Sequence, residues 1–538
     1  MKLRILLTRY LKLIATLIVI SVLILAFILP APTLLAVRGL TYIFVWNTPV
    51  AAGILIALAT SITAINALIK RNKRKALRAS ILTLGILVIT ITYSATIGAE
   101  FSHKAVFQQV SIKTYDSVPR NLSFVSRSVP YAVAAHYLSA AIVEPRYACG
   151  DPDPVMINGK YRWVAPTVPS GFFPALQIDN TDILVLDAES PKNITVVKVA
   201  TLPFNEETIG WSNLNLMVYN VDFWSDIAQI FYTPCEGEWV AIIPVMGWRL
   251  TAFYNYPYWL GVWIVRSDGS MEFYTPEEAL KHPCLSKLPI FPEKLARMIA
   301  EYYATWRHGW LNALLYHYDQ YVIDEVGRAS INRQPYLVYV GGKPYWATFL
   351  RPYGGGKTLA VFILTDAVTG DTRIYKLSNQ EWIGVGYAET LVRNSHPEIT
   401  WEAGEEAGVQ TFYIAEVNPF LVNGTLYWRV IVAPSDNTAV SFIDYVNAKT
   451  GSVVSEARAP QVSYIIEGTI VDFKSYTANG NTRIILLIDT KDGTRLALVK
   501  AEEHDWRVIS EILFAGKGRR VKLWLNEEGV VLKIEFKD

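Results

Sequence analysis

The sequence predicts an α+β protein with a three-helix N-terminal membrane anchor, a β-rich external domain and a C-terminal barrel. Three long apolar runs lie within the first 99 residues, alternating strand patterns with Gly, Asn or Asp turns recur from residue 150 onward, and helical patterns separate several of these strands. Helices interspersed with antiparallel hairpins are typical of the α+β class. At 538 residues the chain is too long for one compact domain. We therefore divide it into residues 1–99, 100–330, 331–460 and 461–538.

The anchor consists of helices expected at residues 13–29, 50–69 and 79–99, none of which contains Lys, Arg, His, Asp or Glu. Each approaches the roughly 20 residues that cross a bilayer as a helix. The first run is longer than a signal-peptide core of about 7 to 15 residues, which favours a retained helix over a cleaved signal. Ion and proton pathways usually need charges within the membrane, so these helices are expected to anchor, not to transport. Residues 31–47 are expected to form an outer connection.

The segment Lys70–Arg78 sets the orientation of this anchor. Its sequence, KRNKRKALR, carries six positive charges and no acid, and four more basic residues precede the first apolar run. Basic residues that flank transmembrane helices stay on the cytoplasmic side. We therefore expect a multi-pass protein of the cell membrane, with a cytoplasmic N-terminus and with everything after Glu100 outside.

The net charge of +2 combines a basic anchor with an acidic external part. Residues 1–99 hold eleven Lys or Arg and no acid, and the other 39 basic and 48 acidic residues give the remainder a charge of −9. Phosphate binding needs concentrated Lys and Arg, so no nucleic acid is expected as a partner. The expected partners are membrane lipid and other envelope proteins or peptides. Scarce Gln and Cys beside abundant Tyr, Ile and Val suggest a thermophile protein.

Three cysteines follow the third apolar run. An external location permits one disulfide and leaves one thiol over. We expect Cys235 to pair with Cys284, because both follow a proline near the ends of the same predicted unit. Candidate glycosylation sites on the external surface are the sequons NLS, NIT and NGT at Asn121, Asn193 and Asn423.

One strand pattern recurs in the external part. An aromatic pair opens a strand, an apolar alternating strand follows, and a turn of Asp or Asn with Gly closes a hairpin. The clearest copies, 344–375 and 426–454, begin 82 residues apart, which suits a duplicated small domain. Two degenerate copies are expected at 161–190 and 238–274. Apolar spacing predicts helices at 129–142, 292–318 and 397–410.

The strand ends DAVTGDTRIY and NAKTGSVV, each after a Tyr-Trp strand, and the acidic helix pattern at Glu405 and Glu406 resemble PepSY-type modules. The order of N-terminal helices, NGKYRWVAP at 158–166, WRHGWLNALL at 306–315 and two late repeats is similar to a group of uncharacterised prokaryotic multi-pass membrane proteins. PepSY modules are implicated in modulating peptidases or in binding within the cell envelope. The resemblance thus implies a binding role, and it supplies no catalytic residue.

The last segment, 462–538, is expected to fold separately. Three strand patterns, a helical pattern and two more strand patterns follow one another, which is the order of an OB-type barrel. Such barrels often bind oligonucleotides or sugars. The twelve basic and twelve acidic residues of this segment balance, which favours a structural cap over a nucleic-acid site.

Catalytic motifs are not evident. GGGKT at 354–358 resembles the end of a phosphate loop, but Arg351 stands where that loop needs glycine and a strand pattern follows it. The seven histidines show no metal-ligand spacing, and no GxSxG motif occurs. No catalytic residue, metal or cofactor is therefore expected.

The densest polar and aromatic group is Trp306, His308, Trp310 and Asn312. These residues are a candidate pocket for a peptide or a sugar, and the alternative is that they pack a helix on a sheet. We expect a membrane-anchored extracytoplasmic binding or scaffold protein of the cell envelope, without turnover. The rival hypothesis is an envelope hydrolase or protease-linked enzyme with a site between repeats, which a cleft holding two carboxylates would favour.

Overall fold

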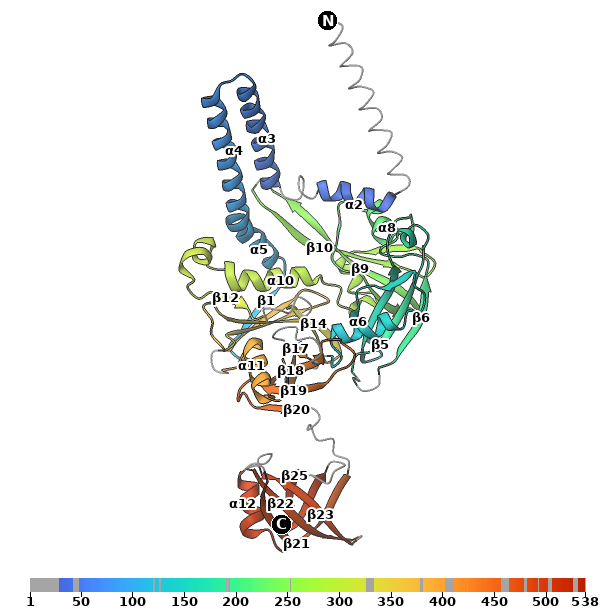
Figure 1. Cartoon of the computed structure of the whole chain (residues 1–538), viewed down its shortest axis with the longest axis vertical. Helices are drawn as coiled ribbons and strands as arrows, with labels where there is room; N and C mark the ends of the chain where they lie inside the picture. The colour runs from blue at the N-terminus through green and yellow to red at the C-terminus, as the bar shows by residue number, and fades with distance from the viewer. Residues whose placement is uncertain are drawn as a thin grey trace. The chain divides into compact units, whose positions relative to one another are not determined.

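The computed structural model describes residues 29–41, 48–119, 121–124, 127–189, 191, 194–251, 253–325, 333–377, 381–401, 411–422, 424–455, 464–478, 481–491, 493–501, 506–525 and 531–537. As predicted, the chain is a mixed helix-and-sheet protein with helices near its N-terminus and a β-rich remainder (Figure 1). It divides into two compact units, Met1–Val453 and Val454–Asp538.

Two N-terminal helices are long and apolar enough to cross a membrane. Helix α3 (Thr48–Ile69) and helix α4 (Lys73–Tyr93) form an antiparallel hairpin around a turn at Arg71 (Figure 1). A π-helical turn, η2 (Ser94–Gly98), joins α4 to α5 (Ala99–Phe107), so that residues 73–107 form one continuous helix. The predicted crossings at 50–69 and 79–99 lie on these helices. The predicted crossing at 13–29 lies outside the described residues, except for Leu29.

The α3–α4 hairpin packs through small residues. A Cβ on Gly53 would lie 2.2 Å from Oγ1 of Thr90, and the hydroxyls of Thr60 and Thr83 are 2.7 Å apart. Its buried residues are all small, namely Gly53 and the alanines Ala51, Ala57, Ala64, Ala67, Ala76 and Ala79, whereas most of its Leu, Ile and Val side chains are exposed. Close packing of small residues with an apolar exterior is typical of helices in lipid.

Part of the expected outer connection is helical. Helix α2 (Pro30–Thr41) begins at a proline, which suits the first turn of a helix. It is fixed on α8 (Leu214–Val221) because the buried guanidinium of Arg38 lies 3.4 Å from the ring centroid of Tyr219 and donates to the carbonyl of Ser225. Residues 31–41 of the expected outer connection therefore form a docked helix, because this tertiary contact adds to a weak local helical signal, and residues 42–47 lie outside the described residues.

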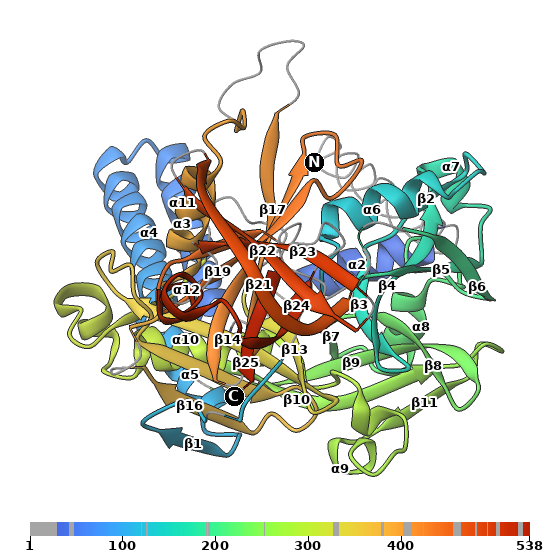
Figure 2. The same cartoon turned by 90° about the horizontal axis from the view of Figure 1, so that it is seen from below.

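The described part of the first unit contains four sheets, of which three are antiparallel and one is mixed (Figure 2). In the first, β4 (Lys160–Pro169) pairs with β5 (Thr181–Asp187), which pairs with β6 (Val196–Leu202); both β2 (Tyr147–Cys149) and β3 (Asp153–Ile157) pair with the other edge of β4. In the second, the same order runs through β9 (Glu238–Leu250), β10 (Asn255–Val265) and β11 (Met271–Tyr274), with β7 (Asp226–Ile227) and β8 (Phe231–Cys235) beside β9.

The third sheet runs through β14 (Lys343–Pro352), β15 (Val361–Asp366) and β16 (Thr372–Lys376), with β12 (Tyr321–Ile323) and β13 (Tyr336–Val340) beside β14. It gains one parallel strand, β1 (Ile112–Tyr115), against β16. The fourth is the meander β17 (Phe412–Val422), β18 (Thr425–Pro434), β19 (Phe442–Asn447) and β20 (Val453–Ser455). A helix precedes the hairpins of each sheet: α6 (Tyr131–Ala140), α8, α10 (Glu293–Glu301) and α11 (Val385–Ser395).

Two-residue turns close the opening hairpin of the first three sheets. Both central residues have positive φ at Asn158-Gly159, Glu236-Gly237 and Gly341-Gly342, which matches the twist of the flanking strands. In the fourth sheet Gly424, at φ +72°, occupies the second turn position. These turns fix the register and thereby decide which side chains of each strand face inward.

Three of the sheets share one hydrogen-bond arrangement around a buried tryptophan. The indole N–H groups of Trp163, Trp346 and Trp428 donate to the carbonyls of Val129, Phe291 and Ile383 at 2.9, 3.0 and 2.8 Å. Each acceptor residue comes two positions before a helix, α6, α10 or α11, and its own N–H donates to an alanine carbonyl, that of Ala188, Ala367 or Ala448. The second sheet lacks this bond among its described residues.

One predicted helix differs from the structure, and a second lies mostly outside the described residues. The helix expected at 292–318 is interrupted after α10 and the π-helical η4 (Tyr302–Trp306), because Gly309 adopts φ +88°, and resumes as η5 (Asn312–Tyr316). The helix expected at 397–410 falls mostly outside the described residues, and the helix of that region is α11, upstream. Short helical pieces complete the first unit: α7 (Phe172–Ala175), α9 (Pro276–Ala279) and η3 (Leu285–Lys287).

The second unit is a five-stranded antiparallel sheet with one helix. Its strand order is β23-β22-β21-β24-β25, and α12 falls between β23 and β24 in the chain. The elements are β21 (Tyr464–Ala478), β22 (Asn481–Thr490), β23 (Gly493–Lys500), α12 (Trp506–Ala515), β24 (Arg520–Leu525) and β25 (Val531–Lys537). Ile and Leu side chains from β21, β22 and β24 and from α12 form its core.

Candidate functional site

A cavity of about 460 Å³ opens where the first three sheets of the first unit meet. Its size falls in the range of small-molecule sites. Strands β3, β8 and β13 each contribute to the wall, and each is the first strand of a hairpin closed by a two-residue turn. The first residue of α10 contributes as well. The lining includes Arg127, Tyr131, Asp151, Asp153, Trp163, Gln229, Phe231, Glu293, Arg333, Tyr336, Leu337 and Trp346.

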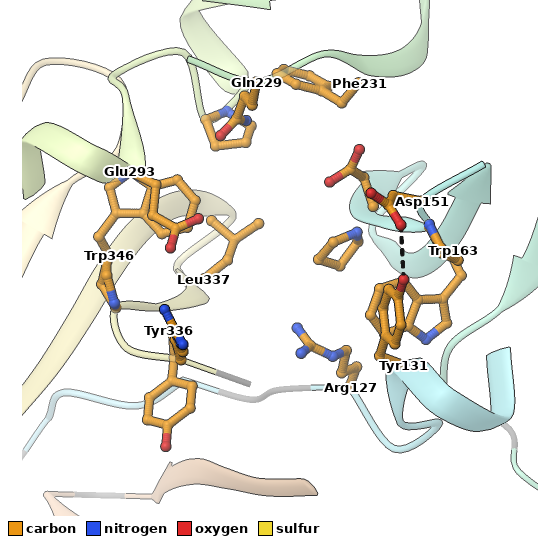
Figure 3. A pocket seen from close by; sticks show the side chains of 16 residues that line it. Arg127, Tyr131, Asp151, Trp163, Gln229, Phe231, Glu293, Tyr336, Leu337 and Trp346 are labelled. Carbon is orange, nitrogen blue, oxygen red and sulfur yellow. Dashed lines mark hydrogen bonds between the residues drawn. The ribbon is translucent and has the colours of Figure 1, made fainter. Parts of the chain in front are cut away.

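Carboxylates and aromatic rings dominate this wall. Figure 3 shows Glu293 on one side of the cavity, Asp151 and Tyr131 on the opposite side, and Arg127 between them at the base. Trp163, Tyr131, Tyr336 and Trp346 supply the ring surfaces. The cavity therefore combines acidic groups with flat apolar surface.

Glu293 is placed by the start of α10. Pro292 precedes it at the helix N-cap, and the buried face of α10, which includes Leu295 and Ile299, holds the helix in the core. Burial raises the pKa of Glu293 to about 7, although Arg297 and Arg127 oppose the shift. Arg297 is bonded elsewhere, to Glu301 and Glu325. Glu293 thus exchanges a proton near neutral pH.

Asp153 begins β3 and is the second acid of the DPDP segment, residues 151–154. Burial raises its pKa well above the usual range, and the negative charges of Glu206, Asp151 and Glu293 add to that rise. Neither Asp153 nor Glu293 forms an ion pair within the described part of the chain. Two half-buried carboxyl groups are therefore available at the cavity wall.

A third half-buried acid, Glu206, adjoins this group. Tyr232 is buried on β8 and donates a hydrogen bond of 2.7 Å to Oε1 of Glu206. Burial raises the pKa of Glu206 to about 7, and the bond from Tyr232 lowers it. Because Glu206 raises the pKa of Asp153, protonation of either group favours ionisation of the other.

Arg127 is held rigidly at the base of the cavity. Its Nε and one terminal nitrogen bond Oε1 of Glu416 at 3.2 and 2.5 Å, and its guanidinium lies 4.7 Å from the ring centroid of Trp163. The Glu416 side chain has no exposed surface. The Arg127 charge is therefore neutralised by Glu416, and the cavity keeps its acidic character.

Asp151 lies at the more open side. Its Oδ1 accepts a 3.0 Å hydrogen bond from the hydroxyl of Tyr131, the first residue of α6 (Figure 3). Burial and this bond raise the pKa of Tyr131 to about 12, so the phenol remains a donor at neutral pH. No group of three or more His, Cys, Asp and Glu with metal-binding geometry occurs among the residues described.

The predicted pocket residues lie elsewhere, between η4 and η5. Asn312 is buried and bonds both the N–H and the carbonyl of Tyr318 at 2.9 Å, and the N–H of Trp310 donates to Glu100 at 2.8 Å. His308 is exposed and 3.4 Å from Asp319, and Trp306 ends η4. None of the four lines the cavity described above. Asn312 instead closes the local turn at Tyr318, and Trp310 ties this loop to Glu100 on the helix 73–107.

The structure joins Cys235, at the end of β8, to Cys284 by a disulfide, with the two Cα atoms 5.7 Å apart. Cys149 is a free, half-buried thiol. Asn121 is exposed, while Asn193 and Asn423 lie outside the described residues. Glycosylation at these three sites stays a prediction.

Sequence reasoning missed Asp151, Asp153 and Glu293. Asp151 and Glu293 are 142 positions apart in the chain, so no local spacing could pair them. The one available signal was DPDP beside the first hairpin, because two prolines fix the backbone that presents the two acids.

Comparison with known proteins does not identify the chain. No protein-family model matches it, and no curated protein matches it. Among solved structures, a mutant GH32 β-fructofuranosidase from Bombyx mori in complex with sucrose is 10% identical and covers 82% of this chain and 69% of that one, with a TM-score of 0.18. A mutant Trypanosoma rangeli sialidase with trans-sialidase activity is 10% identical, covering 71% of this chain and 59% of that one, with a TM-score of 0.16.

Proposed function

We propose that this protein is a membrane-anchored extracytoplasmic binding protein of the cell envelope, whose ligand enters the cavity between β3, β8 and β13. Two carboxyl groups at the wall of an aromatic cavity, those of Asp153 and Glu293, have no ion-pair partner among the described residues. This observation carries the proposal. The apolar α3–α4 hairpin supports the anchor, and the basic segment Lys70–Arg78 supports a cytoplasmic turn and an external remainder.

The cavity favours a ligand with a positively charged amine and an apolar or ring-shaped body. A cation near Asp153 and Glu293 would offset the cost of ionising them in a buried place. The tryptophan and tyrosine rings offer apolar and cation–π contacts to the same ligand. An amine-bearing peptide fits this description.

The test is calorimetric titration of the full-length protein in nanodiscs with tri-lysine and with its fully acetylated form. We expect the free amine form to bind and the acetylated form not to bind. Glu293→Gln and Asp153→Asn should each weaken binding about tenfold, equivalent to about 1.4 kcal/mol. Because the pKa of Glu293 is about 7, affinity should rise between about pH 6 and about pH 8.

The matched control is Glu207→Gln, which removes an exposed acid next to Glu206 that does not line the cavity. It should leave the affinity unchanged. Equal binding of both peptides, or equal effects of Glu207→Gln and Glu293→Gln, would show that the cavity carboxylates do not recognise the amine.

One observation favours hydrolysis as a second candidate function. Glu293, with a pKa of about 7, faces Asp151 across the cavity, and a protonated acid opposite a carboxylate suits general acid–base chemistry (Figure 3). A hydrolase would turn over a bound peptide, and Glu293→Gln would abolish turnover while binding persisted. A ligand recovered intact after long incubation would leave binding as the function.

The proposal also covers the architecture, which we interpret as duplicated PepSY-like units followed by an OB-like unit. Four helix-plus-meander sheets, of which three share the tryptophan bond to the residue that precedes the helix, support duplicated PepSY-like units. The strand order β23-β22-β21-β24-β25, with its helix between the third and fourth strands, supports an OB-like second unit. In this arrangement the duplicated units would build the cavity between them, and the second unit would serve as a cap or as a partner-binding module.

A further inference from the structure

The continuous helix 73–107 passes directly from the apolar hairpin into the folded core. Its apolar run ends at Ala99, while Val106 is fully buried in the domain. The ring of Phe101 stacks on Tyr254, with centroids 5.4 Å apart. Residues near position 100 therefore mark the level at which the helix would leave a bilayer, and their neighbours lie at the same level.

The tip of the β9–β10 hairpin is the first of these neighbours. Tyr254 belongs to it, and Leu250 and Phe253 beside Tyr254 are 48% and 70% exposed. Exposing two large apolar side chains to water at a hairpin tip is unfavourable, and the turn itself does not require them. The tip points past the base of α3 and α4 in Figure 1.

The η5 segment lies at the other side of the same helix. The carboxylate of Glu100 accepts the N–H of Trp310 at 2.8 Å, which ties the segment to the exit point. The following residues expose four large apolar side chains, those of Leu311, Leu314, Leu315 and Tyr316. Local hydrogen bonds of Asn312 to Tyr318 fix the turn that presents them.

A third apolar group surrounds α2. The N–H of Ala31 donates to Ile209, whose own N–H donates to Ala175 of α7, so α7 lies beside the start of α2. Phe172, Phe173 and Trp211 are 56%, 75% and 62% exposed there. Only six residues separate α2 from the first residues of α3, which keeps α2 near the end of the membrane hairpin.

We propose that these three groups form one membrane-contacting rim that rests in the interfacial layer of the outer leaflet. The rim consists of Leu250, Phe253, Leu311, Leu314, Leu315, Tyr316, Phe172, Phe173 and Trp211. Each group is tied to a point at which the chain leaves the apolar hairpin, and aromatic residues at that depth are typical of membrane interfaces. The occupant is lipid, because the hairpin already places a bilayer beside all three groups. The inference rests on the proposed membrane anchor.

The experiment uses the full chain in lipid nanodiscs with nitroxide labels on single cysteines, on a Cys149→Ser background that keeps the disulfide. Labels at Phe253→Cys, Leu314→Cys and Phe173→Cys probe the rim. Leu84→Cys, on the outer face of α4, is the lipid control, and Val143→Cys, exposed after α6, is the apolar water control. The measurement is the accessibility of each label to oxygen relative to a water-soluble nickel chelate.

We expect the oxygen-to-nickel ratio at the three rim labels to exceed that at Val143 several-fold and to lie below that at Leu84. Rim labels that match Val143, while Leu84 is in lipid, would overturn the rim and leave the anchor intact. A water-exposed label at Leu84 would overturn the anchor itself, and the rim with it. In a second variant set, Phe253→Asp combined with Leu314→Asp should lower the ratio at Phe173, and an unchanged ratio there would contradict a single rim.

Discussion

Glu293 carries a charge that the folded protein accommodates at a cost. Its pKa is raised to about 7 by burial, whereas in the unfolded chain a glutamate titrates near about 4.3. Above about pH 7 the group is charged in both states, so folding must bury a carboxylate. As the pH falls through about 7 the folded form takes up a proton, and the penalty fades until it vanishes below the unfolded pKa.

Glu293→Gln should therefore stabilise the first unit at about pH 8 and change its stability little at about pH 5. The expected gain at the higher pH is on the order of 1–2 kcal/mol once solvent screening in the cavity is allowed for. Differential scanning calorimetry of both proteins at the two pH values measures it. Glu277→Gln, at an exposed position on α9 away from the cavity lining, is the control and should have no pH-dependent effect. A loss of stability in Glu293→Gln at about pH 8 would mean that the ionised carboxylate has a stabilising partner.

At this scale sequence reasoning identified turn residues but not the cavity. Gly370 and Gly451 are the glycines of the Asp or Asn turns predicted in the copies 344–375 and 426–454, and both adopt positive φ, because a local turn depends only on its own residues. The meeting of Asp153 with Glu293 depends on how whole sheets pack, which no spacing encodes. Density of polar and aromatic residues pointed instead to Trp306–Asn312, where the structure shows a locally bonded loop and an exposed apolar surface.

The indole hydrogen bonds of Trp163, Trp346 and Trp428 occur at the same position in three sheets. Each joins the third residue after the hairpin closure on β4, β14 or β18 to the carbonyl that precedes a helix, and so sets the angle at which that helix meets its sheet. Replacing the indole by a phenyl ring leaves a buried carbonyl without this donor, at a cost of about 1–3 kcal/mol.

We expect Trp163→Phe, Trp346→Phe and Trp428→Phe to destabilise the first unit by similar amounts in urea titrations. Trp263→Phe on β10 is the matched control, because Trp263 is also buried and its indole N–H has no partner among the described residues. It removes the same atoms without breaking a hydrogen bond and should cost less. If all four variants lost stability equally, ring size would explain the effect and the bonds would contribute nothing measurable.

Strands and hairpins were more predictable than helices for a physical reason. An apolar alternating strand followed by a turn of Asp or Asn with Gly defines strand and register locally, as at β15–β16, which pair around Gly370. Helical periodicity alone did not reveal that Gly309 would break the segment after α10 or that Arg38 would dock α2 on α8. Both outcomes depend on backbone freedom and on tertiary contacts that the periodic pattern does not contain.

The whole molecule combines a hairpin suited to lipid with a disulfide suited to an oxidising compartment. Leu, Ile and Val cover the outside of α3 and α4, and the Cys235–Cys284 bond closes a loop across 49 positions. Disulfides persist mainly outside the cytoplasm. Both features fit the proposed orientation, in which the turn of the hairpin with Lys70–Arg78 lies inside and the sheets lie outside.

This orientation predicts opposite labelling of two engineered thiols in intact cells. On a Cys149→Ser background, Asn72→Cys in the basic turn should react with a membrane-permeant maleimide only, whereas Lys449→Cys, exposed on the β19–β20 turn, should react with an impermeant maleimide as well. Lysed cells supply the control, in which both thiols must react with both reagents. Because a charged turn cannot cross the bilayer without giving up the hydration of six cations, the two sites should not exchange sides. Impermeant labelling of Asn72→Cys with protection of Lys449→Cys would invert the topology and place the cavity, and any ligand it binds, in the cytoplasm.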